Sequence, residues 1–502
     1  MPGHTRTLPA VKTVLVALAG AALSVLAFPP FGPGALIVPG TALFLLALRR
    51  ASSPREGLLA GLSFGLAFFG GLMWWLSQLE LIALVLVPVQ ALFFAGYGWW
   101  MARWNDRKPL HWVSMAVGSW AVFELVRYRF PVGGQEWGAV GYAMSDNLVT
   151  RLPAALVGTS GLTVLVVLVG AEIAAAVFSR SWRWGAAALG TLVLVLVPAL
   201  ALGSSSLDGP EVPVAIVQGS TPCPFEHCPP DERLRTFQQH LALTETIEPG
   251  SVELVVWPES STGSTNADPV LNQEIREAIG AQARRIGAPL LIGGDRVVSE
   301  TEFINANVVF DETGEVIGEY RKQHAVPFGE YIPLRPLFEW IPALDRVPRD
   351  MVPGDGPVVF AFPDFDLGSV ISWEGGFSRY SLEHRRLGAN LMVVATNKSS
   401  YGPDAPTSDQ FIGMTRMRAV ELGVPVVHAA VTGKSTVIDA RGSFSVTTRT
   451  GESVVFAGVA GPATTTPYVR IGDLVMWLTA VGGLIVWAYP LVGSRRPNSQ
   501  ED

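Results

Sequence analysis

Long apolar runs divide the chain into two kinds of segment. A helix that crosses a bilayer needs about 20 mainly apolar residues. Runs approaching this length cover residues 10–28, 34–48, 56–77, 80–101, 109–127, 152–178, 184–203 and 472–493. The pattern therefore predicts a transmembrane bundle of seven helices at 1–204, a domain of mixed polarity at 205–471, and an eighth transmembrane helix with a tail at 472–502.

The mixed domain carries the alternation that is typical of an α/β fold. Short apolar, β-branched runs recur at 212–217, 254–256, 289–292, 358–361, 391–395 and 424–431. Amphipathic helical patterns at 231–247, 272–286 and 407–422 separate several of them. A layered α/β domain with a largely buried sheet follows. The sequence Asp311-Glu312-Thr313-Gly314 predicts a hairpin turn inside it.

The overall composition is that of a membrane protein. Hydrophobic residues make up 49% of the chain and charged residues only 16%, whereas soluble domains carry about 25% charged residues. The mean hydropathy is +0.34. The net charge of -7 gives no basic footprint, so nucleic-acid binding is excluded.

Basic residues fall in alternate loops between the apolar runs. They are Arg6, Lys12, Arg49, Arg50, Arg55, Arg103, Arg107, Lys108, Arg180, Arg183, Arg495 and Arg496. The intervening loops carry none, except for Arg129 and Arg151 in segment 128–151. The positive-inside rule therefore predicts cytoplasmic termini and an extracytoplasmic domain at 205–471.

Two features of the first runs concern packing and processing. The first run has the basic start of a signal peptide, but no small-residue cleavage site follows and further runs come after it, so we expect a retained helix. In the third run, Gly57, Gly61 and Gly65 recur every four residues. Small residues at this spacing predict close helix packing.

Two cysteines, Cys223 and Cys228, lie in a proline-rich loop of the outer domain. An oxidising compartment favours a disulfide between them as a local staple. A metal site that includes His227 is the alternative, although no second group of ligands lies nearby. We expect no metal or other cofactor.

Chemically capable residues follow three segments of the outer domain. Glu259 comes directly after an apolar run that ends in Trp257-Pro258, where partial desolvation would raise its pKa and suit a general base. Lys322 could stabilise an oxyanion, and Glu330 could orient it. Ser372 ends another apolar run, where α/β folds expose a nucleophile. Taken singly, the glutamate also fits an ordinary loop residue and the lysine a solvated turn.

A catalytic histidine is the weaker hypothesis for this domain. His324 lies close to Lys322 in the chain. The domain at 205–471 contains no Gly-x-Ser-x-Gly elbow that such a histidine would serve.

Taken together, the motifs resemble the apolipoprotein N-acyltransferase family, whose outer domain belongs to the carbon-nitrogen hydrolase (nitrilase) superfamily. The resemblance extends over nearly the whole chain. It rests on Leu26-Ala27-Phe28-Pro29-Pro30-Phe31, Glu124-Leu125-Val126-Arg127, Trp137, Gly141-Tyr142, Val217-Gln218-Gly219, Trp257-Pro258-Glu259-Ser260, Asn305, the block 322–333 and the run 416–423. The implied fold is an eight-span bundle plus a nitrilase-like α-β-β-α sandwich.

The resemblance implies a two-step acyl transfer in a bacterial inner membrane. A phospholipid would donate an acyl chain to the enzyme, and the α-amine of the lipidated N-terminal cysteine of an apolipoprotein would accept it. Glu259 would then be the general base, Lys322 the oxyanion stabiliser and position 372 the nucleophile. Glu330, Glu374 and Asn305 would support the site. The residues Trp137, Trp373 and Tyr331 would contact lipid or shape the entrance. We expect a monomer that needs no cofactor.

The chain departs from the family pattern at two places. The family motif of cysteine, aromatic residue and glutamate is here Ser372-Trp373-Glu374. The segment after the next strand reads Asn397-Lys398-Ser399-Ser400-Tyr401 instead of Asn-Asp/Glu-Ala/Ser-Trp-Phe, which suggests a divergent substrate loop. A serine hydroxyl needs a stronger base than a thiol, and Glu259 is a poor one. We therefore expect little or no turnover from this chain, either as a Cys-to-Ser replacement that traps substrate or as a natural serine variant.

Two other functions fit parts of the sequence. A membrane-anchored amidase would act on small amides, although a small soluble substrate does not need an eight-span bundle. A lipoprotein-binding homologue without turnover would fit Ser372 but not the retained Glu259, Lys322 and Glu330.

Overall fold

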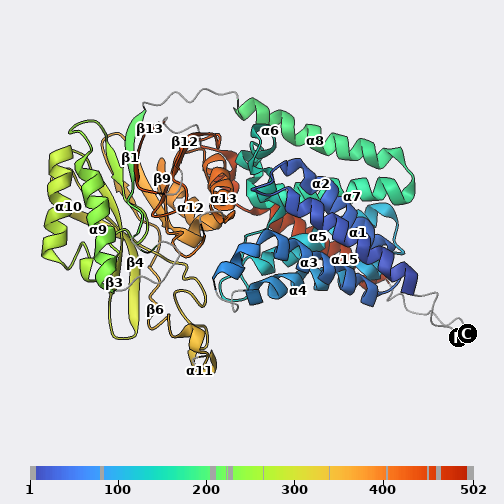
Figure 1. The fold of residues 1–502 in the computed structure, drawn as a ribbon. Coiled ribbons are helices and arrows are strands. Elements are labelled where there is room, and N and C mark those ends of the chain that lie inside the picture. The colour runs from blue at the N-terminus through green and yellow to red at the C-terminus, as the bar shows by residue number, and fades with distance from the viewer. Residues whose placement is uncertain are drawn as a thin grey trace, which may run out of the picture. The chain divides into compact units, whose positions relative to one another are not determined.

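The computed structural model describes residues 7–79, 84–203, 211–221, 223, 230–263, 265–338, 340–402, 405–448, 451–459 and 465–493. The chain forms two compact units (Figure 1). The helical unit comprises Met1–Ser77, Leu81–Ala201 and Ile471–Asp502. The sheet unit comprises Gln78–Glu80 and Leu202–Arg470.

Helices occupy every apolar run predicted from the sequence. The helical unit contains α1 (Thr7–Leu26), α2 (Ile37–Arg50), α3 (Pro54–Leu72), α4 (Leu86–Met101), α5 (Pro109–Arg127), α6 (Leu148–Arg151), α7 (Ala154–Ser179), α8 (Trp182–Gly203) and α15 (Leu474–Gly493). The start of the predicted 80–101 run lies outside the described residues. Two described helices are long and apolar enough by themselves to cross a membrane, over Ala154–Ser179 and Trp182–Ala201.

Close backbone contact joins α3 to α4. A Cβ atom built on Gly57 would lie 2.3 Å from the carbonyl oxygen of Gly98, and one on Gly61 would lie 2.1 Å from that of Phe94. At Gly65 the nearest atom would be Cα of Ala91, at 2.7 Å. No side chain fits at these distances, so the glycine stripe allows the two backbones to touch, which confirms the packing predicted from its spacing.

The sheet unit holds two sheets. The first has the strand order β13-β1-β2-β3-β4-β5, with β6 paired to β4, and the second has the order β12-β11-β10-β9-β8-β7. The strands of the first sheet are β1 (Val212–Gln218), β2 (Leu254–Val256), β3 (Leu290–Val297), β4 (Glu302–Phe310), β5 (Val316–Arg321), β6 (Asp350–Met351) and β13 (Ser453–Val459). Those of the second are β7 (Val359–Ala361), β8 (Asp366–Ile371), β9 (Leu391–Thr396), β10 (Val426–Ala430), β11 (Thr436–Ile438) and β12 (Phe444–Thr447).

Alternate residues of β1 face two different cores. Val214 and Ile216 pack in a core shared with Leu391, Val393 and other residues of the second sheet, so the two sheets stack face to face. Ala215 and Val217 turn to the opposite core, which side chains of two helices also enter. This two-residue period is the geometry of a strand that is buried on both faces.

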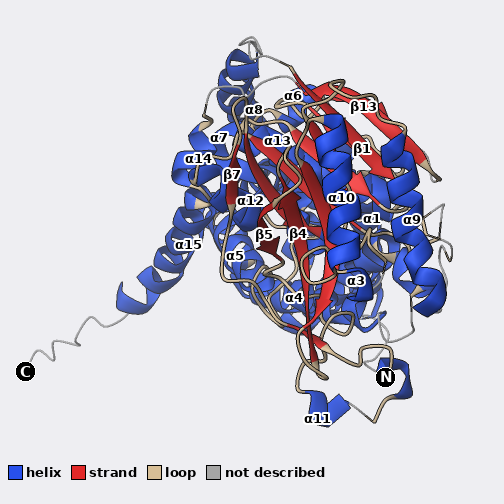
Figure 2. Ribbon diagram, turned by 90° about the vertical axis from the view of Figure 1, so that its left-hand side faces the viewer, coloured by secondary structure: helices blue, strands red, loops and turns tan. Residues whose placement is uncertain are grey.

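Helices cover the outer faces of both sheets. The helices α9 (Pro230–Glu245) and α10 (Gln273–Ile286) lie on the first sheet, and α12 (Ser378–Arg386) and α13 (Thr407–Leu422) lie on the second (Figures 1 and 2). The described residues of the sheet unit also form two short α-helices, α11 (Arg335–Phe338) and α14 (Pro467–Ile471). The predicted α-β-β-α sandwich is thus confirmed.

Sequence patterns located most of these elements and missed a few. The helices α9, α10 and α13 lie where amphipathic patterns predicted them, and β4 and β5 are antiparallel around the predicted turn, where Gly314 has φ of 83°. Sequence analysis did not predict β6, β11, β12, β13 or α12. β13 is an edge strand, and its partner among the described strands, β1, lies more than 200 residues earlier in the chain, so no local pattern marks that pairing.

Candidate active site

Several strands of the sheet unit end at the residues that sequence analysis selected. Glu259 follows β2, Lys322 follows β5 and Ser372 follows β8. β8 and β9 are parallel neighbours, with Ile371 paired to Ala395, so the segment after β9 begins beside Ser372. Carboxyl ends of parallel strands meet at one sheet edge, where α/β folds place their ligands.

Ser372 stands at a sharp turn between β8 and the 3₁₀ helix η8 (Ser372–Gly376). Its φ angle of 50° lies in the left-handed region, which non-glycine residues adopt at some cost. The residue is partly exposed. Its hydroxyl makes no hydrogen bond to any residue that the structure describes. A strained, unengaged hydroxyl at the end of a buried strand is suited to attack a substrate.

Glu259 and Lys322 form a buried, charged network. Lys322 Nζ donates to Glu259 Oε1 at 3.2 Å and to Glu330 Oε1 at 2.5 Å. Glu259 Oε1 also accepts from Asn305 Nδ2 at 2.9 Å, and Glu259 Oε2 accepts from the Asn397 amide at 2.8 Å. The structure therefore brings together four of the predicted residues, and each oxygen of Glu259 already has a donor.

Lys322 is a permanent cation in this network. Its side chain is only 1% exposed. Burial alone would lower the pKa of the lysine, but the charges of Glu330 and Glu259 outweigh that effect and raise the pKa well above its usual range. A cation that stays protonated and fixed between two carboxylates suits the stabilisation of an oxyanion.

Glu374 ties η8 to the segment that carries Lys322. Its Oε2 accepts from the Ile371 amide at 2.8 Å and from the Tyr320 hydroxyl at 2.9 Å. Its Oε1 accepts from the amides of Gln323 at 2.5 Å and His324 at 3.0 Å. Burial raises the pKa of Glu374 to about 7, against these hydrogen bonds and the charge of Lys322. With four donors on its oxygens, Glu374 holds the turn at Ser372 in register with the end of β5.

The three residues assigned to an entrance lie in different settings. Trp373 belongs to η8 and is partly buried, as is Tyr331, which bridges Pro327 through its backbone. Trp137 is in the helical unit, where its ring lies 5.3 Å from that of Trp75 and its side chain is only 3% exposed. The entrance role of all three stays a prediction.

His324 is a weak base in this structure. It is buried against Phe377, and Nδ1 lies 2.9 Å from the Tyr380 hydroxyl. Burial, with the charges of Arg379 and Lys322, lowers the pKa of His324 to about 3. The imidazole is therefore neutral and engaged in packing at physiological pH.

The described residues contain no group of metal ligands. Cys223 is disulfide-bonded, while Cys228 and His227 lie outside the described residues.

Sequence analysis missed two contributors to the site. The Asn397 amide holds Glu259, and Lys398 follows directly with only 6% of its surface exposed. Burial lowers the pKa of Lys398 to about 8, although the charge of Glu259 opposes the shift. The signal in the sequence is the departure from the family pattern at 397–401, which predicts a divergent substrate loop but does not single out Lys398.

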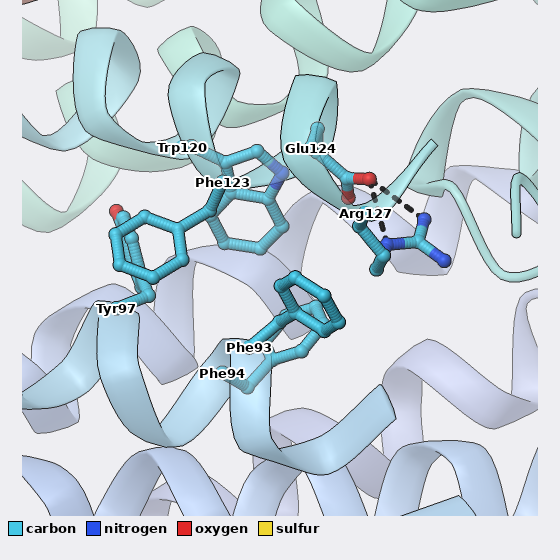
Figure 3. Close-up of a pocket in the computed structure, with 7 residues that line it drawn as sticks. All are labelled: Phe93, Phe94, Tyr97, Trp120, Phe123, Glu124 and Arg127. Atoms are coloured by element: carbon cyan, nitrogen blue, oxygen red, sulfur yellow. Dashed lines mark hydrogen bonds and ion pairs between the residues drawn. The ribbon is translucent and has the colours of Figure 1, made fainter. Parts of the chain in front are cut away.

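The helical unit contains a small cavity whose lining residues do not include any residue of the candidate site. Phe94, Trp120 and Phe123 line it, with the ion pair of Glu124 and Arg127 at its edge (Figure 3). Its volume is about 10 Å³, which is room for about one water molecule. Arg127 also donates to the backbone carbonyls of Gln135 and Trp137, so the pair fixes the segment after α5.

Comparisons with known proteins agree with the two-part organisation. Residues 20–172 match the apolipoprotein N-acyltransferase N-terminal domain, and residues 213–466 match the carbon-nitrogen hydrolase family. The apolipoprotein N-acyltransferase of Geobacter metallireducens is 28% identical over 95% of both chains. That of Rhizobium meliloti is 29% identical over 95% of this chain and 96% of its own.

Among solved structures, an amidase from Nesterenkonia sp. aligns with 52% of this chain and 93% of its own, at 17% identity and a TM-score of 0.40. Both family matches fall on regions that the sequence had separated, and the second contains Glu259, Lys322 and Ser372. The chain therefore belongs to the carbon-nitrogen hydrolase family and carries the N-terminal domain of apolipoprotein N-acyltransferases.

Proposed function

We propose that this protein is an apolipoprotein N-acyltransferase, which moves an acyl chain from a phospholipid to the α-amine of a lipidated N-terminal cysteine. The observation that carries the proposal is the buried contact of Glu259 with Lys322, beside a strained turn at Ser372 that Glu374 ties to the end of β5, in a chain that matches both domain families. Relatives of that name are similar over nearly the whole length.

The site residues divide the acyl transfer into two steps. The nucleophile at position 372 attacks the ester carbonyl of the phospholipid, and the lysophospholipid leaves to give an acyl-enzyme. The amine of the acceptor then attacks the acyl-enzyme and restores the nucleophile. Lys322 stabilises the oxyanion in both steps, while Glu259 accepts the proton from a thiol or from the amine. Glu330 and Asn305 hold these two side chains in place.

The membrane setting supports the same assignment. Eight apolar helices with basic loops on alternate sides would place the sheet unit outside the cytoplasm, with both termini inside. A lipid donor has to reach the site from the bilayer, which an anchored domain allows. The protein would act as a monomer in the inner membrane and use no cofactor.

The Ser372→Cys variant tests the acyl transfer directly, because a thiol requires only a weak base. The purified variant in detergent is incubated with phosphatidylethanolamine and a diacylated lipopeptide, with Ser372→Ala as the control. Mass spectrometry should detect a lipopeptide that has gained one acyl chain with the cysteine variant only. Hydrolysis of small amides instead would identify an amidase. If neither product forms, the proposed reaction is refuted.

A further inference from the structure

The segment after β9 places a buried amine at the same sheet edge as the nucleophile. Ser372 directly follows β8, and Lys398 lies two residues beyond the end of its parallel neighbour β9. The residue between, Asn397, donates its amide to Glu259 at 2.8 Å. Lys398 is therefore part of the wall that holds the general-base carboxylate.

Aromatic contacts bring the lysine toward the turn that presents Ser372. Lys398 Nζ lies 4.2 Å from the ring centre of Phe411 and 5.6 Å from that of Tyr401. The other side of the contact is η8, because a Cβ atom built on Gly375 would lie 3.0 Å from Cζ of Phe411. The same phenyl ring thus touches both the amine and the short helix that begins at Ser372.

Lys398 lacks the carboxylates that keep Lys322 charged. Within the described part of the chain, its amine has no hydrogen-bond acceptor and no ion pair, while only 6% of the residue is exposed. Its charged form is opposed by burial and by Lys322, and Glu259 only partly compensates, so the pKa falls to about 8. His428, on β10, and Tyr401 are the other titratable groups that face it, and burial keeps the imidazole neutral at physiological pH.

We propose that Lys398 is the general base that activates Ser372, so that this chain works as a serine-lysine acyltransferase in place of a thiol enzyme. The inference rests on the proposed function and adds a catalytic residue to it. Serine with lysine is an established alternative to serine with histidine in acyl transfer.

Each proton in the proposed reaction has a defined destination. The neutral amine of Lys398 takes the hydroxyl proton as Ser372 Oγ bonds to the ester carbonyl carbon. The bond from that carbon to the glycerol oxygen then breaks, and the oxygen takes the proton from the Lys398 ammonium to leave as lysophospholipid. In the second step of the serine form the acceptor amine attacks the seryl ester and passes its proton through Lys398, in place of Glu259, to the departing Oγ, whereas in the Ser372→Cys form Glu259 takes both protons.

A fluorophosphonate probe tests the activation of Ser372 without any lipid substrate, since it phosphonylates activated serines with loss of fluoride. The full-length protein in detergent is labelled and the adduct is located by mass spectrometry. We expect labelling at Ser372 that rises tenfold per pH unit and levels off near pH 8. Lys398→Met should lower its rate at least ~100-fold, while Lys434→Met, at a partly exposed lysine paired with Asp409, should not change it.

Lys398→Arg separates the base from a structural cation, because arginine keeps the charge and the aromatic contact but cannot deprotonate. It should lose labelling in the native chain yet keep acyl transfer in the Ser372→Cys background within about threefold, which also shows that it folds. The proposal is overturned if Ser372 of the unsubstituted chain is not labelled, or if its labelling rate is the same in both Lys398 variants as in that chain. If Ser372 is labelled in the expected Lys398-dependent way but the Ser372→Cys variant transfers no acyl chain, the proposed function is refuted, whereas the activation of Ser372 by Lys398 is still supported.

Discussion

At the scale of single residues, the site contains two buried lysines whose surroundings favour different protonation states. Lys322 lies between the carboxylates of Glu259 and Glu330, so it stays charged. Lys398 is also buried, against the ring of Phe411, and within the described residues its amine makes no ion pair, so its neutral form is accessible. The expectation of little turnover assumed that Glu259 was the only base for Ser372. The position of Lys398 provides a second one.

The role of Glu259 can be measured in the thiol form of the protein. In the Ser372→Cys background, Glu259→Gln should lower acyl transfer by about 10²- to 10³-fold, because the amide cannot accept the proton and no longer balances Lys322. The initial rate of lipopeptide acylation is the measurement. Glu312→Gln, at an exposed turn, is the matched control and should have no effect. Equal rates in the two variants would remove Glu259 from the mechanism.

At the scale of elements, the molecule relies on short contacts between backbone segments. Glu374 joins the turn after β8 to the end of β5 through hydrogen bonds to three amides and a hydroxyl. The α3–α4 pair relies instead on the absence of side chains at Gly57, Gly61 and Gly65. A side chain that cannot accept the hydrogen bonds of Glu374 would release the turn, and a side chain larger than that of glycine would separate α3 from α4.

The glycine contact can be tested by adding a single methyl group. Gly61→Ala should destabilise the helical unit by about 1–3 kcal/mol, since the new Cβ would overlap the Phe94 carbonyl and the helices would have to move apart. Gly190→Ala in α8 is the control, because beyond the local helix backbone no atom lies within 4 Å of its added Cβ. The apparent Tm in detergent should fall for the first variant and stay equal or rise for the second. A fall of the same size in both would contradict this account of the contact.

At the scale of the whole molecule, the alternation of basic loops is the basis for the proposed topology. The loop between α4 and α5 would be cytoplasmic and the sheet unit extracytoplasmic. The α4–α5 loop and the sheet unit each carry an exposed residue that can be replaced by cysteine. Asp106, with its side chain 80% exposed, represents the loop, and Glu312 represents the sheet unit.

A membrane-impermeant maleimide should therefore distinguish the two faces in intact cells. Glu312→Cys in the full chain should react in spheroplasts, whereas Asp106→Cys should react only after the membrane is permeabilised. Cys223, being disulfide-bonded, should not react in either case. The reverse pattern of labelling would invert the topology and place the site in the cytoplasm.

Sequence patterns predicted those parts of the fold that depend on local periodicity. The apolar runs gave all the long helices of the helical unit, and alternating strands and helices gave the sandwich. They did not reveal β13, because its partner β1 lies far away in the chain. They predicted Glu259, Lys322 and Ser372 as strand-end residues, and the structure places Glu259 and Lys322 in contact.

What the sequence determined by itself is the identity and order of Glu259, Lys322 and Ser372, since Glu259 and Ser372 each follow an apolar run that becomes a buried strand and Lys322 follows the hairpin between them. Only the tertiary structure decided the protonation of those groups, because a pKa depends on neighbours that come from distant segments. Lys322 and Lys398 are the same residue type, and both are buried. Two carboxylates contact one of them and aromatic rings contact the other, and this difference in surroundings separates a fixed cation from a base.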